Sequence, residues 1–384
     1  MKHNEIGPEL ICEVWEPKCG LHGFLVVDNT TLGPAGGGTR MAPDLVVEEI
    51  ADLARGMTFK FAIMGLPRGG SKAGIVGNPR LPPEEKIELL HAFGRKIALL
   101  LRENEVSIGP DMGIDAGDVS EIYLGAGRKN PRSGLFQMVI EGDPAAFHFT
   151  GYGVATAATV AASAAGIPVE ECRVIIEGFG QVGVGTARYL SRAGAKVVAI
   201  STLSGAIHDP QGLDVETLIH LRRKHGDACV LHYEKGKPLK SIDIYYLSAE
   251  VLIPGARPYV INAENAQRLN CRIVCPAANI AVTDLGQIEL HRRGIVYVPD
   301  YIANAGGALA SWVDFLGGNF EQGMSAVNRN IGAVCDRVIR RALELKTPAG
   351  IIAEQIVLQT LREAPQKRLS FEETQTKIRS LLGL

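Results

Sequence analysis

The chain has 384 residues, of which 46% are hydrophobic and 21% are charged, and its formal net charge is −2. This length suits two domains better than one, and the composition is that of a soluble globular protein. The near-neutral charge provides no basic field, so we expect no nucleic-acid partner. No uninterrupted apolar stretch reaches the roughly 20 residues that span a bilayer, so we expect no membrane partner either.

The sequence predicts a cytoplasmic protein with reduced cysteines. Its first five residues (MKHNE) contain no apolar segment of the kind found in secretory signal peptides. Seven cysteines occur without a CxxC pair. Cys271 and Cys275 lie close together, but no histidine or second cysteine pair lies near them in sequence. We therefore interpret them as free thiols and predict no metal site.

In chain order, the first part of the sequence alternates strand-like and helix-like segments. Residues 24–27 (FLVV) predict a strand. Residues 48–64 predict a helix because apolar residues recur there at helical spacing. A further helix is expected to open at residues 82–85 (PPEE), since proline suits the first turn and acidic side chains suit the positive end of the helix dipole.

A second alternating series begins after about residue 150. Strands are predicted at residues 174–176, 196–200, 251–253, 273–274 and 295–298, and helices at 182–192, 326–345, 351–363 and 372–382. Such alternation predicts an α/β fold. We expect an N-terminal α/β domain over residues 1–145 and a Rossmann doubly wound parallel sheet over 146–330. Helices over 331–384 should return to the first domain and pack across the cleft.

Residues 178–183 (GFGQVG) fit the pattern G-x-G-x-x-G. The pattern alone is weak in a chain with 44 glycines, but here it follows a predicted strand and opens a helix, as dinucleotide binding requires. The first glycine permits the tight turn, the second lets the backbone approach a pyrophosphate, and the third lets helix and strand pack closely. The alternative is a strand-to-helix turn with glycines by chance. The predicted cofactor-binding residues of this turn are Gly178, Gly180, Gln181, Val182 and Gly183.

The tip of the following strand bears on the choice of cofactor. An acidic residue usually stands about 20 residues after the glycine-rich turn and holds the adenosine ribose. Here Ser201 and Thr202 occupy the tip. Their hydroxyl groups are able to bind either a ribose or a 2′-phosphate, without the repulsion that a carboxylate would cause. The sequence therefore leaves NAD and NADP open, with a tilt away from strict NAD.

Two lysines stand in unusual surroundings. Lys60 lies late in the predicted amphipathic helix, and Lys72 lies in a predicted glycine-rich loop (LPRGGSKAGI, residues 66–75). A lysine in an apolar cleft loses the solvation of its charged form, and the neutral amine acts as a general base or polarises a carbonyl. Taken singly, either lysine is more commonly a surface charge. The glycine-rich packing around Lys72 favours the functional interpretation.

Several segments resemble the glutamate/leucine/phenylalanine/valine dehydrogenase family. The resemblance runs from about Gly33 to Trp312, and separate motifs occur in the family's order, which makes it specific. Some of the motifs are closest to leucine dehydrogenases. The segments are 33–41 (GPAGGGTRM), 57–60 (MTFK), 67–75 (PRGGSKAGI), 109–113 (GPDMG), 150–154 (TGYGV), 277–279 (AAN) and 294–307 (GIVYVPDYIANAGG).

The resemblance implies a reaction and a role for each matching residue. The reaction is NAD- or NADP-dependent oxidative deamination of an L-amino acid to its 2-oxo acid and ammonia, through an imine and a carbinolamine, in a cleft that closes by hinging. Lys60 pairs with the substrate α-carboxylate, Lys72 activates water and stabilises charge at C2, and Asp111 shuttles a proton to and from the nitrogen. Asn279 and Asn304 position nicotinamide and substrate. The other implied residues are Gly36, Gly37, Met57 and Ser311 for substrate, and Thr150 and Ala277 for cofactor.

Gly36 is the informative departure from the family pattern. Glutamate-specific members place a lysine there to bind the side-chain carboxylate, whereas Gly36 offers no charge. A buried carboxylate without a partner is costly, so a non-acidic substrate, aliphatic or aromatic, is expected. Glycine also leaves more room than the leucine that leucine dehydrogenases usually carry at this position, which favours a larger apolar or aromatic side chain. Against this, Ser311 matches a serine that glutamate-type enzymes use on the same carboxylate, and Arg68 would supply a cation from a different direction.

Two rival interpretations remain at this point. The first is a glutamate dehydrogenase in which Arg68 and Ser311 replace the missing lysine. The second is a non-catalytic paralogue that binds nucleotide or amino acid, which the joint presence of Lys60, Lys72 and Asp111 disfavours. The resemblance also implies a homo-oligomer, a hexamer or an octamer, and small molecules as the other partners.

Overall fold

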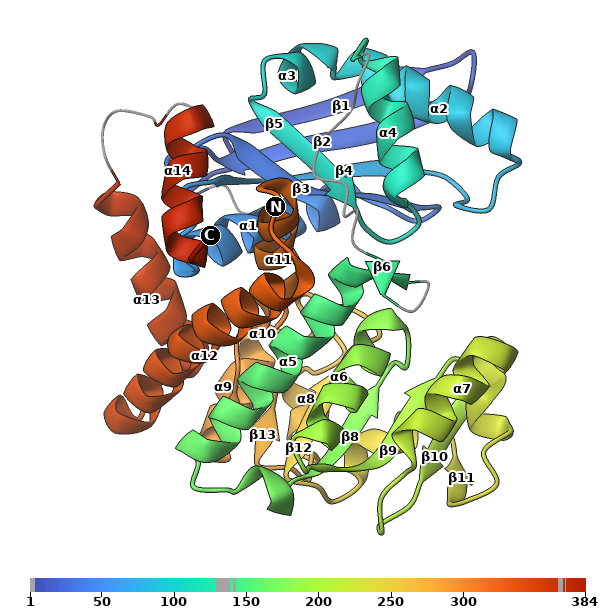
Figure 1. Ribbon diagram of the computed structural model, residues 1–384, viewed down its shortest axis with the longest axis vertical. Coiled ribbons are helices and arrows are strands. Elements are labelled where there is room, and N and C mark those ends of the chain that lie inside the picture. The colour runs from blue at the N-terminus through green and yellow to red at the C-terminus, as the bar shows by residue number, and fades with distance from the viewer. Residues whose placement is uncertain (1–3, 129–138, 141–142, 365–368, 370) are drawn as a thin grey trace. The chain divides into compact units, whose positions relative to one another are not determined.

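Two units, each built on a β-sheet, make up the computed structural model, which describes residues 4–128, 139–140, 143–364, 369 and 371–384 (Figure 1). Unit 1 comprises Met1–Gln137, Ser311–Gly318 and Val357–Leu384. Unit 2 comprises Met138–Ala310 and Asn319–Ile356.

The sheet of unit 1 has five strands in the order β1-β2-β4-β3-β5. Strands β1, β2 and β4 are antiparallel neighbours, whereas β3 runs parallel to both β4 and β5. The carboxyl ends of β3, β4 and β5 therefore lie on the same side of the sheet. The strands are β1 (Leu10–Glu16), β2 (Leu21–Asn29), β3 (Ala35–Ala42), β4 (Gly69–Val76) and β5 (Val106–Pro110).

Helices cover both faces of this sheet. Leu25 and Ile75 point to one core, with α2 and α4, whereas Phe24 and Val26 point to the other, with α1. The alternation of side chains along each strand explains why neighbouring residues enter different cores. The helices of unit 1 are α1 (Val47–Ile63), α2 (Pro83–Lys96), α3 (Ala98–Arg102), α4 (Ala116–Gly125) and α14 (Phe371–Leu382).

Strand β4 corrects one sequence expectation, because the segment predicted as a glycine-rich loop around Lys72 is a buried strand. Its glycines are required by helix packing. A Cβ on Gly70 would lie 2.2 Å from the backbone nitrogen of Thr58, and one on Gly74 would lie 2.6 Å from a side-chain carbon of Ile50. Helix α1 therefore packs almost directly on the backbone of β4, which only glycine permits.

The sheet of unit 2 has seven strands in the order β11-β10-β9-β8-β12-β13-β14. The five strands from β9 to β14 in this order are parallel, which confirms the predicted Rossmann type. Strand β10 departs from it by running antiparallel to β9. Only Leu203 and Ser204 separate these two strands, and so short a turn joins antiparallel neighbours alone. The strands are β8 (Arg173–Glu177), β9 (Lys196–Thr202), β10 (Gly205–His208), β11 (Lys237–Leu239), β12 (Val251–Pro254), β13 (Ile273–Val274) and β14 (Val296–Tyr297).

Helices also lie on both faces of the second sheet. Ile175 and Leu252 point to a core that includes Ala266 of α8 and Leu290 of α9. On the opposite face α5 and α6 pack closely together, because Gly151 of α5 lies against the backbone of Gly185 in α6. The helices are α5 (Ala145–Ala164), α6 (Gln181–Arg192), α7 (Val215–His225), α8 (Ala263–Ala266), α9 (Asp284–Arg292) and α10 (Asp300–Ala303). A short hairpin, β6 (Val139–Ile140) and β7 (Asp143–Pro144), precedes α5.

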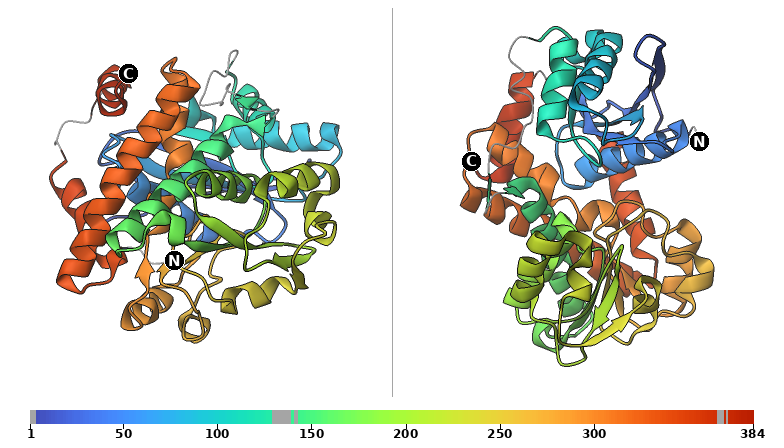
Figure 2. Two further views of the ribbon diagram at one scale, coloured as in Figure 1. Left: turned by 60° about the horizontal axis from the view of Figure 1, so that its bottom comes forward. Right: turned by 90° about the vertical axis from the view of Figure 1, so that its right-hand side faces the viewer.

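The two units divide the chain differently from the boundaries expected at residues 145 and 330. Residue 330 lies inside α12 (Phe320–Leu345), a continuous helix that is prominent in Figure 2. This helix belongs to unit 2 because it packs along α5, where the rings of Phe149 and Phe320 are 5.1 Å apart. The chain instead changes unit after Gln137, Ala310, Gly318 and Ile356. The second of these boundaries falls within α11 (Gly306–Phe315) and the fourth within α13 (Ala349–Arg362).

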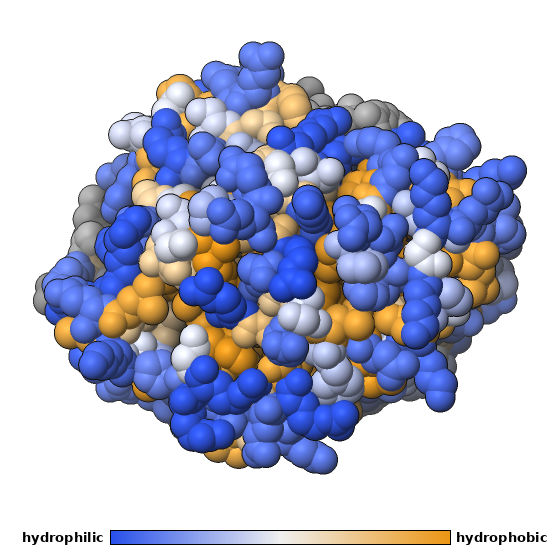
Figure 3. Space-filling model, turned by 90° about the horizontal axis from the view of Figure 1, so that it is seen from below, coloured by the Kyte–Doolittle hydropathy of each residue, from blue (hydrophilic) through white to orange (hydrophobic). Residues whose placement is uncertain are grey.

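The surface has the mixed character expected of the composition. Figure 3 shows hydrophilic side chains spread over one face, with small apolar areas between them. No helix in the described part of the chain is long and apolar enough to cross a membrane. Among the same residues, no group of three or more histidine, cysteine or acidic side chains is arranged to hold a metal ion. The seven cysteines are free thiols.

Candidate active site

A buried ion pair joins two of the predicted catalytic residues. Lys72 lies in β4 and Asp111 follows β5, and the two strands flank β3. The Nζ atom of Lys72 is 2.6 Å from Oδ2 of Asp111. The pair faces Gly38 of β3, where a Cβ would lie 3.1 Å from Nζ and 2.9 Å from the Cβ of Asp111. Glycine at position 38 therefore keeps the surroundings of the pair open.

Arg40 is a second cation on the same carboxylate, and the sequence analysis did not single it out. Its Nε donates to Oδ2 of Asp111 at 3.2 Å, and its NH1 forms an ion pair with Glu49 at 2.6 Å. Arg40 directly follows the glycine-rich segment 33–39, and this position was the one sequence feature that pointed to a role for it. Its partners are 9 and 71 residues away in sequence, so spacing could not identify them.

These contacts determine the charge of Asp111, whose side chain is 21% exposed. Burial by itself would raise the pKa of the carboxyl group. The attraction of Lys72 and Arg40, with hydrogen bonds from Lys72 and the backbone N–H of Met112, outweighs burial and lowers the pKa to about 2. Asp111 is therefore ionised at neutral pH. The expectation that Lys72 lies in apolar surroundings omitted this carboxylate, which forms an ion pair with it.

The predicted α-carboxylate ligand, Lys60, lies in the last turn of α1 and is 7% exposed. One turn earlier, the hydroxyl of Thr58 donates to Asp28 at 2.6 Å, and Nε of Arg55 donates to the same carboxylate at 2.8 Å. These bonds fix the end of α1 against β2. Met57 belongs to the same turns and is half-buried.

The structure corrects the expectation that Gly36 leaves room for a larger apolar substrate. A Cβ on Gly36 would lie 2.8 Å from NH2 of Arg68 and 3.0 Å from the hydroxyl of Ser107. The space beside Gly36 is thus filled by a buried guanidinium. Glycine is required at position 37 for a different reason, because β3 and β4 approach closely there and a Cβ would lie 1.7 Å from the carbonyl oxygen of Ser71.

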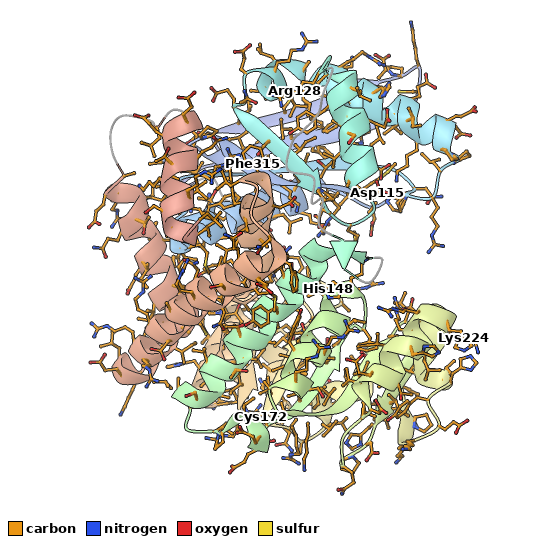
Figure 4. All side chains as sticks on the ribbon, viewed as in Figure 1. Asp115, Arg128, His148, Cys172, Lys224 and Phe315 are labelled. Atoms are coloured by element: carbon orange, nitrogen blue, oxygen red, sulfur yellow. The ribbon has the colours of Figure 1, made fainter. Side chains whose placement is uncertain are left out.

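Ser311 and its neighbour Trp312 lie in the part of α11 that belongs to unit 1. The guanidinium carbon of Arg68 is 5.3 Å from the ring centre of Trp312. Figure 4 labels Phe315 at the end of this helix and Asp115 at the N-terminus of α4, just after the loop that carries Asp111.

In unit 2, the glycine-rich turn between β8 and α6 has the geometry that a dinucleotide needs. Gly178 has a φ of 84°, a conformation that favours glycine. A Cβ on Gly183 would lie 2.0 Å from the carbonyl oxygen of Gly178, so helix and turn touch. Gly180, by contrast, is exposed and borders open space, and no side chain caps the helix that starts at Gln181. The backbone N–H groups of this first turn, which includes Val182, are therefore suited to a pyrophosphate.

The two hydroxyl residues at the tip of β9 are engaged within the protein. The Thr202 hydroxyl donates to the carbonyl oxygen of Asp227 at 2.6 Å and accepts the N–H of Ser204 at 3.2 Å. The Ser201 hydroxyl accepts the N–H of Gly178 at 3.4 Å. Both residues are buried. Thr202 therefore supports the turn after β9, which weighs against its predicted contact with a ribose.

A pair of asparagines lies after β13 and β14 in unit 2, with Asn279 in the segment that follows β13 and Asn304 at the C-terminus of α10. The Asn304 Nδ2 donates to Oδ1 of Asn279 at 2.8 Å and lies 3.4 Å from the carbonyl oxygen of Ala277. The Oδ1 of Asn304 is buried and accepts no hydrogen bond from the residues that the structure describes. Such an acceptor suits the carboxamide of a nicotinamide. Thr150 lies in α5, next to the close contact between α5 and α6.

Comparison with known proteins gives the same family in both units. The family "Glutamate/Leucine/Phenylalanine/Valine dehydrogenase" matches residues 142–345, and "Glu/Leu/Phe/Val dehydrogenase, dimerisation domain" matches residues 10–123. The chain therefore belongs to the glutamate/leucine/phenylalanine/valine dehydrogenase family. It is an amino-acid dehydrogenase that uses NAD or NADP.

Several of the similar proteins are glutamate dehydrogenases by name, and one similar solved structure is the L-tryptophan dehydrogenase of Nostoc punctiforme. Glutamate dehydrogenase of Aeropyrum pernix is 32% identical over 332 residues, which are 84% of this chain and 76% of the relative. NAD-specific glutamate dehydrogenase of Staphylococcus aureus is 33% identical over 310 residues, 77% of this chain and 72% of the relative. The hetero-hexameric glutamate dehydrogenase of Thermus thermophilus, in a leucine-bound crystal structure, superimposes with a TM-score of 0.78 at 27% identity, covering 94% of this chain and 89% of the other.

Proposed function

We propose that this chain catalyses the oxidative deamination of L-glutamate to 2-oxoglutarate and ammonia, and the reverse reductive amination. The ion pair between Lys72 and Asp111, 2.6 Å apart, carries the proposal. A buried ammonium in β4 and an ionised carboxylate just after β5 provide charge stabilisation and proton transfer together. Relatives of 32 to 33% identity over most of their length carry the name glutamate dehydrogenase, and this supports the choice of substrate.

Asp111, Lys72 and Lys60 have different roles in the proposed reaction. A bound nicotinamide would supply the hydride acceptor that converts the substrate amine into a protonated imine. Water then adds to C2, and Asp111 takes up the proton that the water releases and passes it to the nitrogen. As ammonia leaves, the hydroxyl of the carbinolamine loses its proton to Asp111 and becomes the carbonyl, with Lys72 stabilising the developing charge on oxygen. Lys60 binds the α-carboxylate and fixes the α-carbon.

The dinucleotide would be held by the backbone of unit 2. The open space over Gly180 and the uncapped first turn of α6 suit the pyrophosphate, and the buried acceptor of Asn304 suits the carboxamide. We infer no preference between NAD and NADP from the tip of β9, because Ser201 and Thr202 already have partners in the protein. We further propose that the enzyme is cytoplasmic and forms a homo-oligomer; the hetero-hexameric relative supports an oligomer without distinguishing identical from different subunits.

A panel of amino acids tests this function. Purified protein is supplied with NAD or NADP and with glutamate, leucine, valine, phenylalanine or tryptophan, and formation of the reduced nicotinamide is followed by absorbance. We expect the highest kcat/KM with glutamate, and a loss of roughly 100-fold or more in Lys72→Ala. An apolar substrate used in preference to glutamate would support the second candidate, which rests on the uncharged Gly36. Nucleotide binding without any reaction would support a non-catalytic paralogue.

A further inference from the structure

The side chain of Glu177 joins two neighbouring segments at the carboxyl end of the parallel strands in unit 2. Glu177 is the last residue of β8 and directly precedes the glycine-rich turn. Its Oε2 atom accepts the backbone N–H groups of Gly255 and Ala256, each at 2.8 Å. These two residues follow β12, the strand next to β8. One carboxylate oxygen therefore holds the start of the loop after β12 against the end of β8.

The loop after β12 also packs directly on the glycine-rich turn. A Cβ on Gly178 would lie 3.0 Å from the carbonyl carbon of Gly255 and 3.1 Å from the backbone nitrogen of Ala256. The two backbones thus approach each other without room for a side chain between them. Gly178 begins the turn that we propose for the pyrophosphate, so the position of this loop limits the position of that turn.

Hydrogen bonds continue from this loop to the pair of asparagines. The carbonyl oxygen of Pro254, which precedes Gly255, accepts the N–H groups of Ala277 at 2.9 Å and Ala278 at 3.1 Å. The carbonyl oxygen of Ala277 lies 3.4 Å from Nδ2 of Asn304. The turn after β8, the loop after β12 and the segment after β13 are therefore connected. Ligands of open α/β sheets lie across the carboxyl ends of the strands, where these three segments are.

We propose that Glu177 is a positioning residue that fixes the pyrophosphate turn and the nicotinamide end of the dinucleotide site relative to each other. This inference rests on the dinucleotide site of the proposed function. Hydrogen bonds to a charged acceptor are stronger than neutral ones, so the loop after β12 is already ordered before a dinucleotide binds, and binding costs less. The negative charge of a carboxylate opposes a diphosphate, which favours a role through the loop over direct contact.

The first test compares a whole dinucleotide with its adenine half in Glu177→Leu, because leucine accepts no hydrogen bond. Calorimetry gives the dissociation constants of the reduced dinucleotide that the wild type prefers, NADH or NADPH, and of ADP or its 2′-phosphate. We expect the constant to rise by about 10-fold or more for the dinucleotide and by less than about 3-fold for the adenine half. Only the dinucleotide needs both ends of the site at a fixed separation. An equal loss for both ligands, or no loss for either, would overturn the proposal.

Two conservative variants separate the hydrogen bonds from the stability of the fold. Glu177→Gln keeps a side-chain oxygen that accepts the same two N–H groups, so its dissociation constant for the dinucleotide should stay within about 3-fold of the wild-type value. Glu177→Asp keeps the charge on a side chain one methylene shorter, and it replaces Glu177→Leu if that variant does not fold. We expect it to weaken dinucleotide binding by about 5-fold or more. Failure of glutamine to preserve binding, or unchanged binding with aspartate, would contradict the proposal.

Glu250→Leu is the matched control. The Glu250 carboxylate accepts the backbone N–H of Arg173 at 2.8 Å, at the opposite ends of the same two strands. Each leucine variant therefore removes a carboxylate that joins β8 to β12, and we expect both to lower the melting temperature. Only Glu177→Leu should weaken the dinucleotide. An equal loss of dinucleotide affinity in Glu250→Leu would show that general stability, and not positioning by Glu177, is responsible.

Binding and turnover together distinguish failure of this inference from failure of the proposed function. If the wild type oxidises no amino acid but its affinity for the dinucleotide depends on Glu177 as described, the proposed reaction is wrong and the role of Glu177 stands. If glutamate is oxidised and Glu177→Leu keeps the wild-type dissociation constant for the dinucleotide, the reaction stands and the role of Glu177 is wrong. A wild type that binds neither NADH nor NADPH would overturn both.

Discussion

At the scale of single residues, the notable feature is that the carboxylate of Asp111 forms ion pairs with two cations. Asp111 accepts both the ammonium of Lys72 and the guanidinium of Arg40, and all three groups are largely buried. Two positive charges hold the pKa of the carboxyl group at about 2 despite burial. Glu49 forms an ion pair with NH1 of the same guanidinium.

Arg40→Gln tests this arrangement through the pH profile. Because Arg40 lowers the pKa of Asp111, its removal should raise that pKa, and the carboxylate should then be lost at higher pH as the solution is acidified. We expect the acid limb of the kcat/KM profile to move upward by about one pH unit. Glu49→Gln, which leaves Arg40 in place, should not move it upward. An unchanged acid limb in Arg40→Gln would show that Arg40 does not act on Asp111.

Part of this site could be predicted from the sequence. Lys60, Lys72 and Asp111 lie in short motifs that occur in the order typical of the family. A charged residue within a glycine-rich segment, as at Lys72, was also recognisable from the sequence. The contacts of Arg40 with Asp111 and of Arg68 with Gly36 and Ser107 depend on which strands are neighbours. Sequence spacing carries no such information, so Gly36 was interpreted as empty space when it is filled by Arg68.

At the scale of secondary structure elements, glycines in β4 let α1 approach the sheet. Gly70→Ala would bring a Cβ to 2.2 Å from the backbone of Thr58, which cannot move without shifting the helix. We expect it to destabilise unit 1 by about 3 kcal/mol, seen as a lower denaturant midpoint. Gly56→Ala, in α1 but facing open space, should instead stabilise by about 0.5–1 kcal/mol. Equal effects of the two variants would contradict this packing argument.

The turn before α6 yields a separate prediction. Gly180 has a φ of −79° and open space around it, so alanine fits the protein itself. The added methyl group would occupy the approach to the backbone N–H groups of the helix. We expect Gly180→Ala to weaken NADH binding by about 10-fold or more while the melting temperature of the free protein stays the same. Unchanged NADH affinity would argue against this turn as the pyrophosphate site.

The elements themselves were predicted unevenly. The strands and helices from β8 to β9 are short apolar runs with regular spacing, and the sequence identified them. Strands β3 and β4 were missed because glycine, which normally disfavours strands, is abundant in both. The reversal of β10 follows from a two-residue turn after β9 that the apolar pattern does not reveal.

At the scale of the whole molecule, the proposed function assigns different chemistry to the two units. Unit 1 carries the ion pair that we propose for proton transfer, and unit 2 carries the glycine-rich turn that we propose for the dinucleotide. The similar glutamate dehydrogenase of Thermus thermophilus is a hetero-hexamer, and for this chain we predict a homo-hexamer. Sedimentation analysis of the purified protein should therefore give roughly six times the mass of one chain. A monomer at micromolar concentration would contradict this prediction.

The most direct test of the central claim is the kcat of Asp111→Asn in oxidative deamination of glutamate. Asparagine keeps the shape of the side chain but cannot accept and return a proton, so we predict a loss of about 100- to 10,000-fold in kcat with NADH affinity unchanged. Asp115→Asn is the control, because Asp115 caps α4 and asparagine caps equally well. A wild-type kcat in Asp111→Asn would contradict the account.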